Sequence, residues 1–461
     1  MVPALIAVAT LAAVATTARR LGWGWTAPMI VYAAVWTVAV IINAAKFFPF
    51  YDLAGSTWAA IGAAGVAFVG AGFAARFLPA IAHGRACDDS RLVTVTRVYF
   101  CLGLLGAALF FFQVHRVLGI EAILTRPIDV HTALANRTIG SAHLFLYYFG
   151  VAGTILLGYQ MFCRTARPRT VDLFLLAGFI LAMAVSTERN HMLWALACWL
   201  FMLMAPPVGD STLVRMAGVG TAIAVLAVTF YIGAGQWLGK SATNIANALV
   251  IEGGQADPAF TPEVRSRLAT PGYVPDLEVD VPASSRLRLI LPGGPLHPFA
   301  VLYMSVAAAL PSLDQGISLH ERSYGQLTFR PFVRGLSRLG LIPDTLRLTS
   351  YDDVRTPYPA NAYTYLYEHV RDFGLAGAIV FPGLFGLLAG WLYLQAAAMP
   401  GSQWAVWLAM LQGMILWSPF QNRFVLTVSA YLVAALGVAF IFSRSSRSYN
   451  ASMSATSRSA E

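Results

Sequence analysis

The chain has 461 residues, a net charge of +9, and a composition that is 57% hydrophobic and only 11% charged. Soluble globular proteins carry about 25% charged residues, so this composition excludes an ordinary cytosolic enzyme, a disordered chain and a small disulfide scaffold. The basic residues cluster at the ends of apolar segments, which is typical of membrane topology signals and disfavours binding to nucleic acid.

Apolar segments recur along most of the chain, and each approaches or reaches the length that crosses a hydrocarbon core of about 30 Å. Helix is the expected conformation, because an isolated strand cannot satisfy its backbone polar groups in lipid. The predicted fold class is therefore an all-α polytopic integral membrane protein with about eleven transmembrane helices. The predicted spans are approximately 3–18, 23–43, 57–75, 92–114, 143–163, 170–187, 190–206, 213–236, 373–395, 403–420 and 424–443.

The expected organisation is eight spans in residues 1–239, a long polar connection in 240–372, three spans in 373–443, and a low-complexity tail in 444–461 that we expect to be disordered. When the connections are assigned alternately to the two sides, one side collects twelve basic residues and the short connections of the other side collect six. The richer side is the cytoplasm. This predicts an outside N-terminus, a cytoplasmic C-terminus, and an extracytoplasmic 240–372 connection.

The long connection concentrates the polar chemistry, because it holds 13 of the 22 carboxylates and 12 of the 31 basic residues. Within it, the apolar run 298–311 has the length of a re-entrant or interfacial segment. Arg322, Arg330, Arg334 and Arg338 follow at spacings that would form a basic face on one helix. Adjacent carboxylates at 352 and 353 have no third ligand nearby, so no metal and no other cofactor is expected.

The most informative segment is 351–393. Residues 361–371 are predicted to be helical, Asp372 is well placed to cap the span that follows, and glycines at 374, 377, 383, 386 and 390 allow close packing. Asn361, Tyr363 and Thr364 are followed by Glu368, then by Asp-Phe-Gly at 372–374 and by Gly377 and Gly386. This pattern, after a long late loop, resembles the Wzy-type O-antigen polymerases, a family of oligosaccharide repeat-unit polymerases. The likeness covers about 45 residues and the turn at 186–189.

The resemblance implies an enzyme of the bacterial inner membrane that builds a cell-surface polysaccharide. Its substrate would be an oligosaccharide repeat unit held on a polyprenyl pyrophosphate at the outer face of the bilayer. The growing glycan would be transferred to a new lipid-linked unit, with a flippase and a chain-length regulator as partners. Such a transfer requires a cation for the departing pyrophosphate, a base for the attacking hydroxyl, and a groove for the lipid.

The pyrophosphate-binding candidates are arginines, because the planar guanidinium binds phosphate through two hydrogen bonds and stays charged. They are Arg189, Arg423, Arg355 and Arg137. Snorkelling toward lipid headgroups is the alternative role of such residues.

The candidate bases are the residues of the long connection that can accept a proton near working pH. They are Glu368, His369, Asp352 and Asp353. An ion pair of Glu368 with Arg371 or Arg355 is the structural alternative. The candidate sugar-binding residues are Tyr363, Tyr367, Asn361 and Asn422, with an aromatic belt as the alternative for the tyrosines.

Two other functions stay open. An O-antigen ligase would use the same leaving group and differ only in the acceptor. A flippase or transporter of lipid-linked sugars is disfavoured, because the predicted spans carry almost no charge and no internal repeat is visible.

Overall fold

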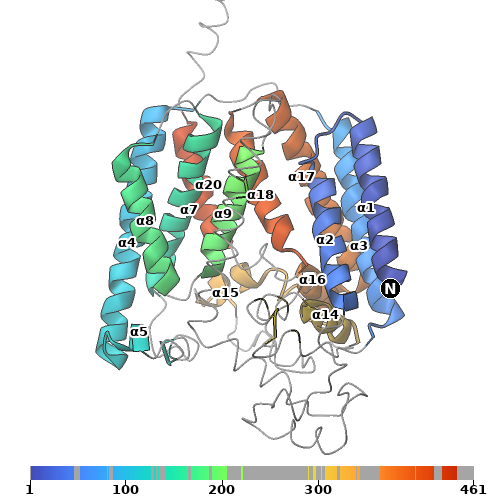
Figure 1. The fold of residues 1–461 in the computed structure, drawn as a ribbon, viewed down its shortest axis with the longest axis horizontal. Helices are drawn as coiled ribbons and strands as arrows, with labels where there is room; N and C mark the ends of the chain where they lie inside the picture. Colours follow the sequence, from blue (N-terminus) through green and yellow to red (C-terminus); the bar gives the residue numbers. More distant parts are fainter. Residues whose placement is uncertain are drawn as a thin grey trace, which may run out of the picture. The chain divides into compact units, whose positions relative to one another are not determined.

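The computed structural model describes residues 2–45, 52–79, 87–125, 142–164, 168–185, 189–204, 307–318, 322–338, 364–399, 401–419 and 428–443, together with 81, 129–130, 133, 220–221, 289, 294–296, 299, 303 and 340–342. Within these ranges the chain is helical and contains no strand, so the all-α prediction is confirmed for the described part (Figure 1). The helices are α1 (Val2–Arg20), α2 (Pro28–Ala45), α3 (Gly55–Ala74) with the 3-10 turn η1 (Ala75–Phe77), α4 (Asp89–Leu118), α5 (Ala122–Thr125), α7 (Ala142–Cys163), α8 (Thr170–Val185), α9 (Arg189–Leu203), α14 (Ala309–Ser318), α15 (Arg330–Arg338), α16 (Tyr365–Phe373), α17 (Leu375–Ala398), α18 (Gln403–Trp417) and α20 (Val428–Ile441).

Six of these helices are long and apolar enough to cross a membrane: α1, α2, α3 with η1, α4, α7 and α17. They coincide with six of the eleven predicted spans. Shorter apolar helices occupy the predicted spans at 170–187, 190–206 and 424–443, and α18 occupies the one at 403–420. The predicted span 213–236 lies outside the described residues except for 220–221. A helical membrane protein is the coarse architecture that these lengths and compositions support.

The chain forms two compact units, and neither is continuous in sequence. Unit 1 contains Met1–Phe73, Tyr231–Leu387 and Ile415–Leu426. Unit 2 contains Ala74–Phe230, Leu388–Met414 and Thr427–Glu461.

The centre of unit 1 is an aromatic cluster that joins α2, α3 and α16. The ring of Tyr32 stacks on Phe68 with centroids 4.1 Å apart, and its hydroxyl lies 3.1 Å from the hydroxyl of Tyr365. The indole of Trp36 donates to Ser418 Oγ at 3.0 Å. Aromatic residues bring large apolar area, and buried hydroxyl and indole groups need partners. Here the two tyrosine hydroxyls pair with each other and the indole pairs with Ser418. The cluster therefore fixes α16 against the first spans.

The start of α3 is capped by a residue that lies far away in sequence. Asp314 of α14 accepts a hydrogen bond from the backbone N–H of Ala54 at 2.9 Å and another from the hydroxyl of Thr57. A carboxylate at this position satisfies donors that the helix itself leaves free. In the predicted apolar segment 298–311, the last residues are the first turn of α14, which continues to Ser318.

Close packing of α17 against α3 depends on glycine. A Cβ at Gly386 would collide with the backbone carbonyl of Phe68, and one at Gly72 would lie 3.3 Å from the carbonyl oxygen of Gly386. The packing role expected for Gly386 is therefore what the structure shows.

Unit 2 contains an ion pair within its apolar helices. Arg97 of α4 donates from Nε to Asp172 of α8 at 2.6 Å, and the Asp172 carboxylate also accepts the backbone N–H of Arg169. The predicted spans are thus not free of charge, and here each of the two charges has a partner.

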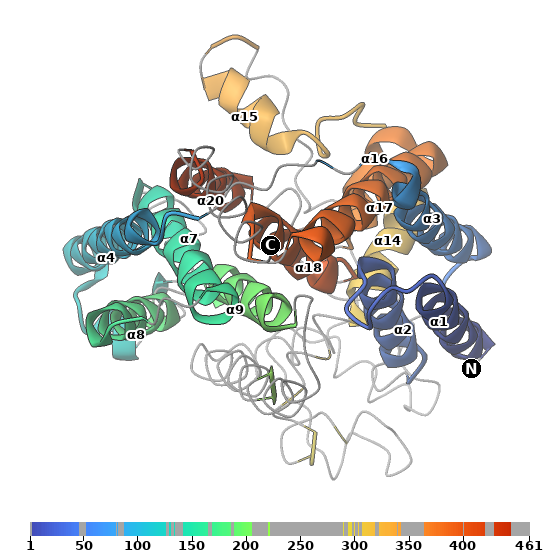
Figure 2. The ribbon, with the colours of Figure 1, turned by 90° about the horizontal axis from the view of Figure 1, so that it is seen from above.

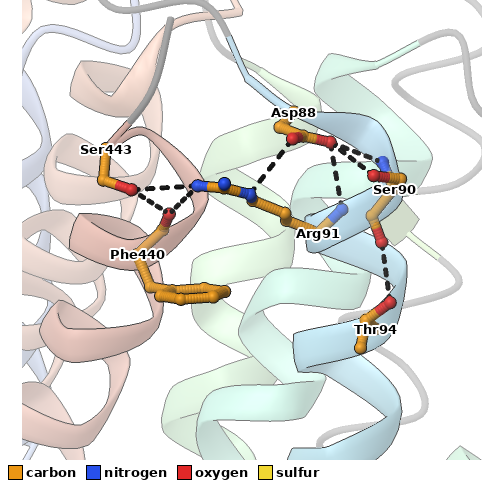
Figure 3. Close-up of polar contacts among 6 residues, drawn as sticks. All are labelled: Asp88, Ser90, Arg91, Thr94, Phe440 and Ser443. Atoms are coloured by element: carbon orange, nitrogen blue, oxygen red, sulfur yellow. Dashed lines mark hydrogen bonds and ion pairs between the residues drawn. The ribbon is translucent and has the colours of Figure 1, made fainter.

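A second polar arrangement in unit 2 joins the N-terminus of α4 to the C-terminal end of α20 (Figure 3). Asp88 caps α4 by accepting from the backbone N–H groups of Ser90 and Arg91, each at 3.1 Å. The guanidinium of Arg91 donates to the carbonyl of Phe440 at 3.3 Å and to Ser443 Oγ at 3.0 Å. A cation at the carbonyl end of α20 is electrostatically favourable.

Candidate functional site

The short helix α16 carries the candidate site and leads directly into α17. Thr364 precedes it in an extended conformation (ψ 157°), so α16 begins at Tyr365. The first residues of the predicted helix, 361–363, lie outside the described residues. The N–H of Tyr365 donates to the carbonyl of Ser418 at 2.9 Å. Gly374 ends the helix with a φ of 63°, a backbone conformation that is unfavourable for residues with a side chain. Its N–H donates a hydrogen bond to the carbonyl of Val370.

Four ionisable side chains of α16 are buried. Glu368, His369 and Asp372 are each 1% exposed, and Arg371 is 4% exposed. Charged residues are almost never buried to this degree unless they are paired or bind something. This concentration on one nine-residue helix is the feature that distinguishes α16 from every other described helix of unit 1.

Arg371 has no hydrogen-bond partner for its side chain among the described residues. Its Nε and Nη1 atoms are both buried and unsatisfied, and it forms no ion pair with Glu368. The ion pair with Arg371 that was the alternative for Glu368 is therefore not formed. Since a buried guanidinium without an anion is costly, the site favours binding of an anionic group at Arg371.

His369 lies between an aromatic ring and a hydroxyl group. Its imidazole stacks on Phe381 of α17 with centroids 4.3 Å apart, and Nδ1 lies 3.1 Å from Thr328 Oγ1. Its Nε2 atom is buried without a hydrogen-bond partner among the described residues. Burial lowers the pKa of His369 to about 3. The imidazole is therefore neutral near pH 7 and a weak base, which argues against the role predicted for it.

Asp372 does not cap α17, and the prediction that it would is wrong. Its two carboxylate oxygens accept backbone N–H bonds from Leu327 at 3.3 Å and from Thr328 at 2.6 Å. These bonds hold the turn 322–329 against α16, together with the bond from the Ser323 N–H to the carbonyl of Arg371. In this position the carboxylate satisfies two buried backbone donors of the turn through charge-assisted hydrogen bonds.

Arg322 is not part of the predicted basic helix face. It precedes α15, and its guanidinium donates to the carbonyl of Val370 at 2.9 Å, near the C-terminal end of α16. Arginine at this end complements the negative end of the helix dipole. Only positions 330, 334 and 338 of the predicted set belong to α15.

Tyr367 is buried in protein, and its ring packs where a Cβ at Gly316 of α14 would have to lie. It is therefore not open for stacking on a sugar. The remaining predicted site residues give no side-chain geometry: Arg189 is the first residue of α9, where only the backbone is described, and the others lie outside the described residues. These others are Asn361, Tyr363, Asp352, Asp353, Arg355, Arg137, Asn422 and Arg423.

The structure thus brings Glu368 and His369 of the predicted site together with two groups that sequence reasoning did not select, Arg371 and Thr328. Arg371 was visible in the sequence as a neighbour of Glu368, but its burial without a partner was not. Thr328 lies about 40 positions before His369, and no local pattern connects them.

A comparison of the chain with known protein families, with curated proteins and with solved structures finds no match.

Proposed function

We propose that this protein is a membrane-embedded glycosyltransferase that polymerises oligosaccharide repeat units carried on polyprenyl pyrophosphate. The observation that carries the proposal is the buried, partnerless guanidinium of Arg371 beside the buried carboxyl of Glu368, at the start of the candidate span α17. A cation and a carboxyl group at a membrane boundary are what a lipid-linked pyrophosphate and an acceptor hydroxyl require.

Arg371 takes the role of the pyrophosphate ligand in this proposal. Guanidinium binds phosphate oxygens through paired N–H donors, and Nε and Nη1 are the two donors of Arg371 that lack a partner. As negative charge develops on the leaving group, a preorganised donor in a water-poor site contributes about 3 to 4 kcal/mol of transition-state stabilisation. Arg189, Arg137, Arg355 and Arg423 stay candidates for further phosphate contacts.

Glu368 takes the role of the general base. The acceptor hydroxyl oxygen forms a bond to the anomeric carbon of the donor glycan, the bond from that carbon to the pyrophosphate oxygen breaks, and the hydroxyl proton passes to the Glu368 carboxylate. Glu368 is preferred to His369 because burial lowers the pKa of His369 and makes that imidazole a weak base.

The proposed setting is the bacterial inner membrane, with α16 on its outer face, an outside N-terminus and a cytoplasmic C-terminus. The contact of Asp314 with the start of α3 supports this topology, because it requires both to lie on the same side. A flippase would supply the lipid-linked units from the cytoplasm, and a chain-length regulator would act on the product.

The test is incubation of the purified protein with a synthetic polyprenyl-pyrophosphate oligosaccharide. A ladder of products supports polymerisation. A single transfer to a different acceptor lipid replaces the proposal with the ligase, and movement of the lipid across vesicle bilayers without a new glycosidic bond replaces it with transport.

Variants connect the reaction to α16. Arg371→Lys keeps the charge and loses the paired donors, so turnover should fall by at least about a hundredfold. Arg116→Gln, which removes an exposed arginine of α4, is the matched control and should retain full activity. Glu368→Gln should bind the lipid substrate but not elongate it.

A further inference from the structure

The helix α15 presents an exposed apolar face. Phe332 is 61% exposed and Leu336 is 42% exposed, and both lie on the helix face that continues from Phe329, which is 46% exposed. Positions 329, 332, 333 and 336 recur at the spacing of a single helical stripe. Figure 2 shows α15 extending away from α16 instead of packing along it. A group of large aromatic and aliphatic side chains that are exposed on one helix face is typical of an interaction surface.

The opposite face of α15 is basic. Positions 330, 334 and 338 are arginines one helical turn apart, so the helical repeat places them on the side opposite to Phe332 and Leu336. Between residues 322 and 342 the sequence contains four arginines and no carboxylate. A surface that joins this charge to exposed phenylalanine and leucine is complementary to an apolar layer bordered by anions.

The start of α15 lies close to the N-terminal part of α17, which is a candidate membrane span. The ring of Phe329 contacts Phe381 of α17 with centroids 6.1 Å apart, and a Cβ at Gly325 would lie 3.3 Å from Phe373. Phe381 is six residues beyond the first residue of the candidate span, Leu375, so the segment that leads into α15 packs near the N-terminal end of α17.

We infer that α15 is an interfacial helix that binds an anionic phospholipid surface, with the apolar face that carries Phe332 and Leu336 at the acyl boundary and the face that carries positions 334 and 338 at the level of the headgroup phosphates. The ligand class is an anionic bilayer lipid, and the binding does not depend on the glycan reaction. Because Thr328 and Leu327 bond to Asp372 immediately before α15 begins, lipid binding by α15 also holds the turn 322–329 on α16.

The experiment measures hydrogen–deuterium exchange of the full-length protein in two nanodiscs, one of phosphatidylcholine alone and one of phosphatidylcholine mixed with phosphatidylglycerol. The amides of 332–338 should exchange at least about fivefold more slowly in the anionic disc, because each basic residue near such a surface contributes roughly that factor. Raising the salt concentration should remove most of the difference.

A double variant with Arg334→Gln and Arg338→Gln should lose the difference between the two discs, whereas Arg76→Gln should keep it. Exchange in α17 serves as the check that each variant is folded. Equal exchange of α15 in the two discs, or a difference that persists in the double variant, overturns the inference. Protection that appears only when a second protein is added overturns it too, since α15 would then be a protein-docking helix.

Discussion

The backbone of Gly377 in α17 lies against the carbonyl of His369 in α16, so closely that a Cβ at Gly377 would collide with that carbonyl. This contact sets the angle between the helix that carries the site and the span that follows it. Because the obstacle is backbone and cannot rotate away, the substitution of this glycine must move one of the two helices.

Gly377→Ala should therefore destabilise the protein by about 1–3 kcal/mol, although alanine is the better helix former. Gly383→Ala is the matched control, because its Cβ would meet Ala67 at an ordinary 3.9 Å. Thermal unfolding in detergent micelles distinguishes the two. Equal midpoints for both variants would show that the close contact does not constrain the junction.

Replacement of the buried guanidinium should separate stability from activity. Arg371→Met fills a similar volume and removes a buried charge that has no partner, so the free energy of unfolding should rise by about 1–4 kcal/mol while transfer activity is lost. A fall in stability would mean that Arg371 has a structural counter-charge. Unchanged activity in Arg371→Met, with the protein still folded, would remove Arg371 from the proposed pyrophosphate site.

The buried imidazole predicts a particular dependence on pH. The pKa of His369 is lowered to about 3 in the folded protein, whereas it is about 6.5 in an unfolded chain. Below pH 6.5 the unfolded chain binds a proton that the folded chain does not, so the free energy of unfolding falls as pH decreases from 6.5 toward 3. The slope from this group approaches about 1.4 kcal/mol per pH unit.

The measurement is the unfolding midpoint as a function of pH for the natural chain and for His369→Gln. Other titrating groups contribute equally to both, so the difference between the two curves isolates the imidazole. The variant should be less sensitive to acid below pH 6.5. Parallel curves would mean that His369 is already accessible to protons in the folded state.

The cap of α4 offers a test in unit 2. A hydrogen bond from the Ser90 hydroxyl and the backbone N–H of Arg91 hold the pKa of Asp88 below its usual range. Since the folded-state pKa is depressed, the stabilisation is present above the unfolded value of about 3.9 and is lost as pH falls through the folded value. Asp88→Ala should cost about 1 kcal/mol, whereas Asp88→Asn should cost only a few tenths because asparagine caps equally well.

The difference between these two variants is measured by thermal unfolding near neutral pH. If asparagine is as harmful as alanine, then the ion pair with Arg91 contributes more than the backbone cap does.

Local patterns predicted the helices well and the site only in part. Apolar length alone located α1, α4 and α17 to within a few residues, because burial in lipid depends on composition over one continuous segment. The role of Asp372 was mispredicted for the opposite reason. Its partners at positions 327 and 328 are 45 and 44 residues away, and nothing in the sequence around Asp372 indicates them.

The same distinction applies to α16. The pattern from Glu368 to Asp372 indicated polar chemistry, but it also predicted that Tyr367 would be available to a ligand. Gly316 leaves the space that this ring fills, and the pairing of these two residues depends on how α14 folds against α16.

The bond between Asp314 and the start of α3 has a consequence for biogenesis. The ribosome synthesises α3 well before residue 314. Until Asp314 has been made, the amide donors of the first turn of α3 therefore face water or lipid headgroups. The earliest inserted part of unit 1 is thus completed only after translation has reached residue 314, within the long connection. Truncation of the chain upstream of Asp314 should leave a nascent intermediate that proteases and the quality-control machinery can recognise.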